Sequence, residues 1–92
     1  MDEAIETRRR KLLFRAQRRG FREVDLIFGA FAQAHLPHLN AGELDRFEAL
    51  LGVPDWRIYG WIVGREPVPP AYDDDIFRRL SAYRKNLDAK ES

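Results

Sequence analysis

Arginines and carboxylates gather around one glycine of this chain, in the stretch Arg18-Arg19-Gly20-Phe21-Arg22-Glu23. Guanidinium groups hold carboxylate or phosphate oxygens in paired hydrogen bonds, and an exposed glycine backbone lets a partner approach closely. A simpler interpretation is that Gly20 ends one helix with a left-handed cap and that Glu23 complements the dipole of the next helix. Both interpretations predict a bend between two helices, and the first predicts that the bend is a contact site.

Residues that carry enzyme chemistry are scarce. The chain has no cysteine, which excludes disulfides, thiolate metal ligands and a thiol nucleophile. Its two serines and single threonine have no histidine and acid nearby in the sequence to activate them. His35 and His38 lack the i, i+4 spacing of a helical zinc pair, so we interpret them as surface or capping residues. We predict a protein that is not an enzyme, without catalytic residues, a metal site or a stably bound cofactor.

Positive charge is concentrated near the N-terminus. Residues 7–22 carry eight Lys and Arg side chains and no acid, although the net charge of the chain is only +1. The remaining residues are therefore strongly acidic on balance, and they include the run Asp73-Asp74-Asp75. This distribution favours oriented docking on an acidic partner. A solvated helical face is the simpler interpretation of the same basic residues.

Length and composition limit the class of protein. Ninety-two residues fit one domain, and a charged fraction of 34% argues against a membrane span. A domain of this size rarely encloses a deep cofactor cavity, so we expect binding on its surface. The first six residues include three acids and no apolar stretch, which indicates neither a secretion signal nor a mitochondrial presequence. We predict a monomer of the bacterial cytoplasm without membrane contact.

The hydrophobic pattern predicts helices throughout, because apolar residues recur at intervals of three and four. The expected helices span about residues 3–17, 21–35, 41–51, 55–63 and 72–87. Together they predict an all-α, compact five-helix bundle. It forms a single domain over residues 1–92, with an ordered core at about 8–87 and frayed ends. The expected core side chains are Ile5, Leu12, Leu13, Ala16, Val24, Ile27, Phe28, Phe31, Leu44, Phe47, Leu50, Leu51, Ile58, Tyr59, Ile62, Ile76, Leu80, Tyr83, Leu87 and one or both of Trp56 and Trp61.

Several helix boundaries have recognisable signals. Asn40 and Glu43 have the spacing of a capping box, and Pro54 suits the first turn of the helix that follows it. The three aspartates at 73–75 fall where the last helix should begin, at the positive end of its dipole. Residues 65–70 contain three prolines and predict an extended connector.

Two blocks of the sequence together resemble the succinate dehydrogenase assembly factors, or flavinators, small helical proteins marked by an Arg-Gly-x-x-Glu motif. Here the motif is Arg19-Gly20-Phe21-Arg22-Glu23, and residues 10–16 look like the basic helix that leads into it. The second block is Pro54-Asp55 followed by Ile58-Tyr59-Gly60-Trp61-Ile62, which is similar to the other signature block of the family. The likeness covers about residues 8–86, and the two blocks in one short chain make it fairly specific.

The resemblance implies a helical bundle that binds the flavoprotein subunit of succinate dehydrogenase, or of fumarate reductase, and promotes covalent attachment of FAD. Such a protein is a helper, because the flavin becomes joined to a histidine of the subunit itself. The resemblance places Gly20 and Glu23 at the centre of the contact, with Arg19 and Arg22 as anchors beside them. The flanking candidates for partner binding are Arg15, Arg18 and Asp25.

Two alternatives remain open from the sequence. The basic first helix could bind nucleic acid, since each phosphate contact releases a counterion. Glu23 and Asp25 weaken this interpretation, because they place acids near the start of the second helix, where a helix-turn-helix protein reads the groove. An antitoxin-like regulatory role is neither supported nor excluded by the residues.

Overall fold

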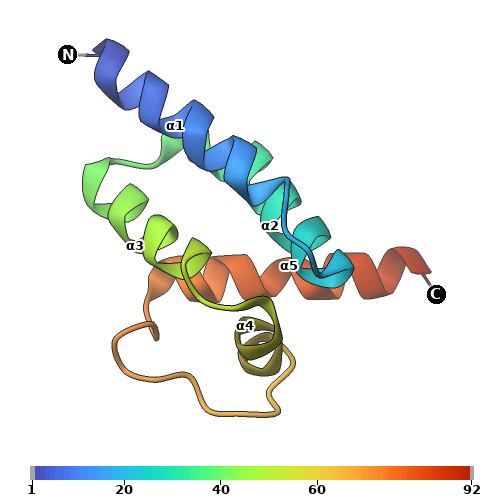
Figure 1. The fold of residues 1–92 in the computed structure, drawn as a ribbon. Coiled ribbons are helices and arrows are strands. Elements are labelled where there is room, and N and C mark those ends of the chain that lie inside the picture. The colour runs from blue at the N-terminus through green and yellow to red at the C-terminus, as the bar shows by residue number, and fades with distance from the viewer. Residues whose placement is uncertain (1, 92) are drawn as a thin grey trace.

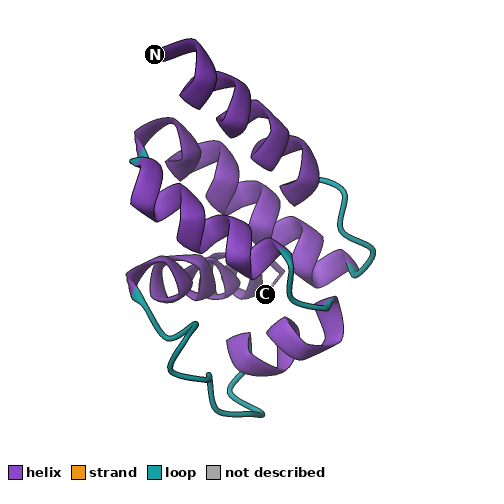
Figure 2. Cartoon of the chain, turned by 60° about the vertical axis from the view of Figure 1, so that its left-hand side comes forward, coloured by secondary structure: helices purple, strands orange, loops and turns teal. Residues whose placement is uncertain are grey.

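The part of the chain that the structure describes forms five α-helices and one short 3-10 helix (Figures 1 and 2). The computed structural model describes residues 2–91, and side chains from residue 4 to residue 84. The elements are α1 (Asp2–Ala16), α2 (Arg22–His35), η1 (Leu36–His38), α3 (Ala41–Leu51), α4 (Asp55–Ile62) and α5 (Asp75–Glu91). No residue from 2 to 91 lies in a strand, so the predicted all-α bundle is confirmed. The frayed ends stay a prediction.

Helix α2 is the centre of the bundle, because it packs against α1, α4 and α5, while α3 packs against α1 and α5. Its apolar stripe is fully buried, as the spacing of Val24, Ile27, Phe28 and Phe31 predicts. The ring of Phe47 on α3 lies 5.8 Å from that of Phe28 and 5.4 Å from that of Phe31. These three aromatic rings form the middle of one continuous core.

Some of the core lies outside the predicted positions. Leu36, Leu39 and Val53 are buried although they belong to η1 or to connecting turns. Of the two tryptophans, Trp61 is buried and Trp56 is 64% exposed. The remaining expected core positions from Leu12 to Leu80 are buried or packed against the core, as is Ile5, and Tyr83 is packed against it too. The side chain of Leu87 lies outside the described residues.

The predicted capping box of α3 is confirmed. The side chain of Asn40 accepts a hydrogen bond from the Glu43 amide at 2.9 Å, and the Glu43 carboxylate accepts one from the Asn40 amide at 2.9 Å. Gly64, just after α4, has the left-handed backbone that favours glycine (φ 78°).

Helix α5 begins at Asp75, three residues later than expected. The prolines of the connector fold residues 69–73 into a turn instead, in which the Tyr72 amide donates to the Pro69 carbonyl at 2.9 Å. The Tyr72 ring packs 5.2 Å from that of Trp61, which fixes the turn to α4. Asp74 then caps α5 by accepting a hydrogen bond from the Phe77 amide at 3.0 Å.

The overall dimensions fit a single compact domain. The radius of gyration is 12.8 Å, close to the value of about 12 Å for a folded chain of this length. No helix in the described part of the chain is long and apolar enough to cross a membrane.

Candidate functional site

Residues 17–21 form the bend between α1 and α2, and backbone hydrogen bonds from both helices define it. The Arg18 amide donates to the Arg15 carbonyl at 3.2 Å, which ends α1. The Arg19 amide donates to the Asp25 carboxylate at 3.0 Å, and the Asp25 amide donates to the Phe21 carbonyl at 2.8 Å. Asp25, predicted as a flanking contact residue, therefore has its carboxylate engaged in holding the bend.

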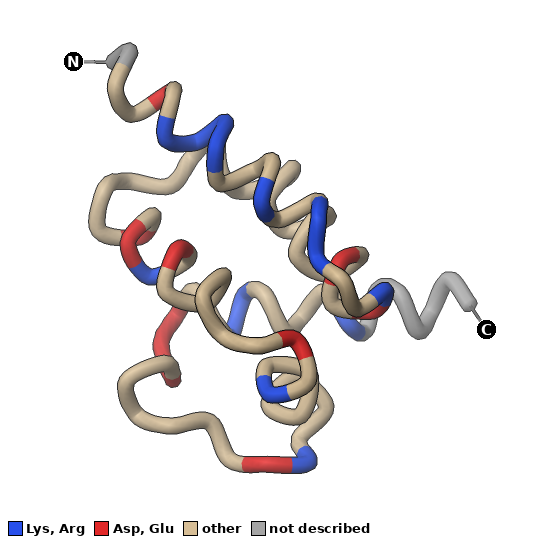
Figure 3. Tube along the Cα trace, in the orientation of Figure 1, with Lys and Arg blue, Asp and Glu red and all other residues tan. Residues whose placement is uncertain are grey.

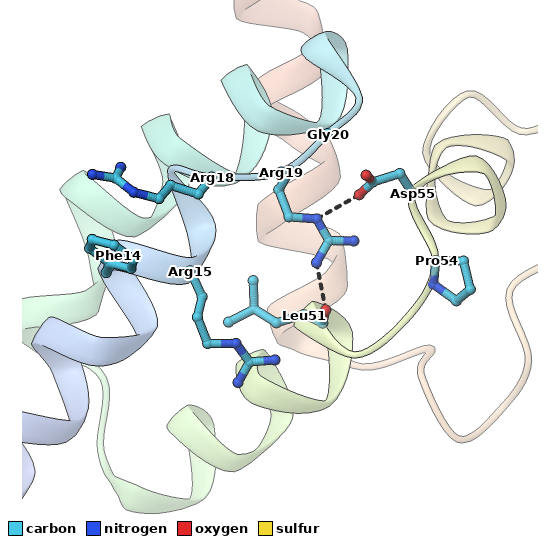
Figure 4. A pocket seen from close by; sticks show the side chains of 8 residues that line it. All are labelled: Phe14, Arg15, Arg18, Arg19, Gly20, Leu51, Pro54 and Asp55. Carbon is cyan, nitrogen blue, oxygen red and sulfur yellow. Dashed lines mark hydrogen bonds and ion pairs between the residues drawn. The ribbon is translucent and has the colours of Figure 1, made fainter.

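The side chain of Arg19 ties this bend to the turn between α3 and α4 (Figure 4). Its Nε donates to Asp55 Oδ1 at 2.6 Å, Nη1 to the Leu51 carbonyl at 2.5 Å and Nη2 to the Val53 carbonyl at 2.7 Å. The Leu51 carbonyl lies at the C-terminal end of α3, where helical hydrogen bonds run out and a cation is favoured, and the Val53 carbonyl lies in the turn that follows. The guanidinium also lies over the ring of Phe28, 4.9 Å from its centre. We call Arg19, Asp55 and the two carbonyls the Arg19 clamp.

Asp55 holds the bend from the other side. Its Oδ1 pairs with Arg19, and its Oδ2 accepts a hydrogen bond from the Phe21 amide at 3.2 Å. The Arg19 side chain is only 9% exposed and that of Asp55 is 25% exposed, so water screens this pair less than a surface ion pair. The Arg19 side chain therefore has its hydrogen bonds within the protein, and it positions the backbone of the bend beside it.

Gly20 does not have the left-handed backbone that we expected, and this prediction is wrong: among the described residues only Gly64 has a positive φ. The bend needs no such cap, because the carboxylates of Asp25 and Asp55 take up the amides of its neighbours Arg19 and Phe21. A Cβ atom at Gly20 would lie 3.7 Å from Asp55 Oδ2, an ordinary contact distance. The fold therefore does not require glycine at this position.

An open groove of about 390 Å³ lies beside Gly20, and we call it the bend groove (Figure 4). Its lining residues are Phe14, Arg15, Arg18, Arg19, Gly20, Leu51, Pro54 and Asp55. Figure 4 shows them coming from the end of α1, the bend, the end of α3 and the start of α4. The groove combines cationic side chains with apolar surface, which suits a protein segment that carries acidic and apolar groups.

Glu23 and Arg22 lie in the first turn of α2 and are exposed. Neither side chain makes a hydrogen bond or ion pair with any described residue, so both are free for a partner. Beside them, Phe21 is 37% exposed and packs edge-on against Tyr59 at 5.0 Å. The bend thus presents a carboxylate, a guanidinium and an aromatic edge together.

The basic run of α1, seen as blue segments along that helix in Figure 3, divides into charges that are paired within the protein and charges that are not. Arg8 pairs with Asp45 at 2.6 Å and Glu48 at 2.9 Å, and these hydrogen bonds, led by that of Asp45, raise the pKa of Arg8. Arg9 pairs with Glu6 at 2.6 Å and donates to the Leu39 carbonyl at 2.7 Å. The run therefore offers a partner fewer charges than the sequence suggests.

His35 is half-buried at the N-cap position of η1, where it also makes contacts that its position in the sequence does not reveal. Its ring stacks on Phe31 with 4.6 Å between centres, and its Nε2 lies 3.0 Å from the Tyr83 hydroxyl. Burial in this contact between α2 and α5 lowers the pKa of His35, and the charges of Arg79 and His38 lower it further. No group of three or more His, Asp or Glu side chains in the described part of the chain is placed to hold a metal ion.

Comparison with known proteins identifies the family. The model of a family described as "Flavinator of succinate dehydrogenase" matches residues 10–84, most of the chain. The chain belongs to the flavinator family. It is 37% identical over 89 residues to succinate dehydrogenase assembly factor 2-A, mitochondrial, of Drosophila mojavensis, covering 95% of this chain and 57% of that protein.

Further relatives agree. Assembly factor 2-B, mitochondrial, of Drosophila melanogaster is 38% identical over 87 residues, covering 92% of this chain and 56% of the relative. Assembly factor 2, mitochondrial, of Candida glabrata is 33% identical over 94 residues, covering 98% of this chain and 61% of the relative. This flavinator chain thus spans less than two thirds of the length of these curated relatives.

The structure adds residues to the site that sequence reasoning left out. Asp55, Leu51 and Phe14 line the bend groove, and Asp55 joins the two signature blocks of the flavinator chain through Arg19. The signal was the Pro54-Asp55 pair that opens the second block, although nothing in the sequence indicates which arginine it meets. Trp56 follows Asp55 in the chain. Its side chain is exposed, and the Arg57 guanidinium lies 5.1 Å from its ring centre.

Proposed function

We propose that this flavinator is an assembly factor of succinate dehydrogenase that binds the flavoprotein subunit and promotes covalent attachment of FAD to it. One observation carries the proposal: the Arg19 clamp fixes the Arg-Gly-x-x-Glu bend while Glu23 and Arg22 stay exposed and unpaired within the described residues. A rigid bend with free charges suits docking, because little conformational freedom is lost on binding.

The seven predicted contact residues divide into two roles in this proposal. Arg19 and Asp25 are positioning residues, because their side chains hold the backbone of the bend. Gly20 permits close approach of the partner backbone, since the fold does not require glycine there. The residues proposed to touch the flavoprotein directly are Arg15, Arg18, Gly20, Arg22 and Glu23.

The protein acts as a helper and not as a catalyst in this proposal. A surface binder promotes a reaction within its partner when it binds the reactive geometry of that partner more tightly than other geometries. FAD stays with the flavoprotein, because the chain has no glycine-rich phosphate loop and its bend groove is open. The flavoprotein subunit of fumarate reductase is a second partner that we propose on the same grounds.

A bacterial cytoplasmic location also stays a proposal, since the names of the relatives place those proteins in mitochondria.

The test is covalent flavin on the flavoprotein subunit, read as flavin fluorescence on a denaturing gel from cells with and without this gene. We expect the band to be lost on deletion, restored by the wild-type gene and not restored by Glu23→Ala. The matched control is Glu66→Ala, which removes an exposed acid from the connector between α4 and α5. Full flavinylation without the gene contradicts the helper role.

Glu23→Ala should remain folded, because an exposed acid in the first turn of a helix typically contributes only about 0.3–1 kcal/mol. Thermal unfolding of the purified variant checks this. A variant that unfolds would show that Glu23 supports the fold and would remove it from the proposed contact.

A further inference from the structure

A row of side chains follows the outer face of α1 toward the bend. Arg10, Lys11, Phe14 and Arg15 line a shallow hollow of about 460 Å³, and Phe14 and Arg15 also line the bend groove. Arg18, which lines the same groove, extends the row. We call these five residues the α1 stripe. The first four recur at helical spacing and share one face of α1, and Arg18 follows them in the bend.

The charge of the α1 stripe is largely uncompensated. Arg10 and Lys11 form no ion pair with any residue that the structure describes. The Arg18 guanidinium lies over the Phe14 ring at 3.9 Å from its centre, a contact that leaves its charge free. Arg15 approaches Glu48 at 3.6 Å, but that carboxylate already pairs with Arg8. Four cations therefore share the stripe with one aromatic side chain, Phe14, that is 57% exposed.

We propose that the α1 stripe is a second docking surface for the flavoprotein subunit, which it binds through an acidic segment with an apolar side chain. The apolar side chain covers Phe14, and flanking carboxylates pair with Arg10, Lys11 and Arg18. Charge complementarity selects this occupant, because the stripe offers four cations and no acid. The inference rests on the proposed function for the identity of the subunit. Because the stripe runs into the bend groove, one partner can cover both surfaces.

A protein segment fits this surface better than nucleic acid. Asp45 and Glu48 of the neighbouring α3 have side chains that are 70% and 48% exposed, and they would repel a phosphate backbone laid across both helices. The free cations follow a single helix face into the bend, whereas Arg8 and Arg9 are held by internal partners. An extended peptide or one helix matches the width of that face.

Binding kinetics of the purified flavoprotein subunit test the proposal. The stripe variant Arg10→Gln/Lys11→Gln is compared with Arg46→Gln/Arg65→Gln, which removes the same charge at exposed positions outside the stripe. At low salt we expect a Kd about two- to thirtyfold weaker for the stripe variant, as loss of two exposed ion pairs predicts. The difference should shrink at high salt. Phe14→Ser should weaken binding at both salt concentrations.

Three outcomes overturn the proposal. Equal weakening by the two double variants would show that only net charge matters. Unchanged binding of both stripe variants, with flavinylation still dependent on Glu23, would remove the stripe and leave the proposed function intact. Unchanged subunit binding together with loss of duplex DNA binding in the stripe variant would assign the stripe to nucleic acid. Wild-type protein that does not bind the subunit at all would contradict the proposed function itself.

Discussion

Arg19 Nε and Asp55 Oδ1 lie 2.6 Å apart although 36 residues separate them in the chain. This ion pair joins the two sequence blocks on which the resemblance to the flavinators was based, since Arg19 lies in the Arg-Gly-x-x-Glu segment and Asp55 lies in the Pro54-Asp55 pair. The second carboxylate oxygen of Asp55 accepts a hydrogen bond from the Phe21 amide, inside the motif. The two blocks therefore form one structural unit, in which the second supports the backbone of the first.

Removing Asp55 should destabilise the fold. Asp55→Ala leaves the mostly buried Arg19 charge without its carboxylate and the Phe21 amide without its acceptor. We expect a loss of about 2–3 kcal/mol in the free energy of unfolding, below the cost of a fully buried pair because Asp55 is partly exposed. Urea denaturation measures this loss. The control Asp45→Ala removes an exposed partner of Arg8 and should cost at most about 1 kcal/mol. Equal losses in the two variants would contradict the clamp.

Two glycines should respond differently to alanine. Gly20→Ala should leave the free energy of unfolding unchanged or raise it by up to about 1 kcal/mol, because φ is not positive there and the added Cβ meets no close neighbour. Gly64→Ala should lower it by about 1–2 kcal/mol, because its φ of 78° strains an L-residue although the space is open. Thermal unfolding of both variants checks the difference. A larger loss at Gly20 than at Gly64 would show that the bend needs glycine for the fold.

One of the three aspartates at 73–75 should matter for the start of α5. Asp74→Ala removes the side-chain cap on the Phe77 amide and should lower the free energy of unfolding by about 1 kcal/mol. Asp73→Ala removes only a 3.4 Å contact with Arg78 at the surface, so we expect a loss near zero. Chemical denaturation of the two variants measures both. A greater loss of stability for Asp73→Ala than for Asp74→Ala would show that Asp74 is not the residue that caps α5.

Stability should depend on pH through His35. Its pKa is lowered in the folded state, so the unfolded chain binds the proton more readily. The free energy of unfolding should therefore fall as pH drops below about 6.5, the ordinary histidine value, toward the lower folded-state pKa. Denaturation midpoints between about pH 7.5 and pH 5.5 test this, a range chosen to stay above the titration of carboxylates. His35→Gln should flatten the profile, and His38→Gln, which changes an exposed ring, should not. A profile equally steep in His35→Gln would place the effect elsewhere.

Much of the bundle is predictable from local chemistry. The Asn40 and Glu43 spacing marks the start of α3 correctly, because both hydrogen bonds of a capping box are made within three residues. The predicted start of α5 is three residues too early, because Tyr72 packs on Trp61 in a contact that hydrophobic periodicity does not reveal. Leu39 and Val53 are buried outside regular α-helix, where the hydrophobic pattern has no period to follow.

The internal roles of the residues around Gly20 could not be predicted from the sequence. The sequence shows that cations gather around Gly20, but it does not show which of them form hydrogen bonds or ion pairs within the protein. Arg19 and Arg18 are neighbours in the sequence, yet Arg19 is 9% exposed in a clamp and Arg18 lies on the exposed ring of Phe14. That difference depends on the carbonyls of Leu51 and Val53, at the end of α3 and in the turn after it, more than thirty residues away.

The long sequence separation within the Arg19 clamp also bears on the order of folding. Residues 17–21 cannot adopt their final shape when α1 and α2 alone have formed, because the acceptors for Arg19 arrive only with the turn that follows α3. Contacts so far apart in the chain carry a loop-closure entropy cost that contacts within one helix do not carry. The proposed docking surface therefore depends on the completed tertiary fold, and an incompletely folded molecule would not present it.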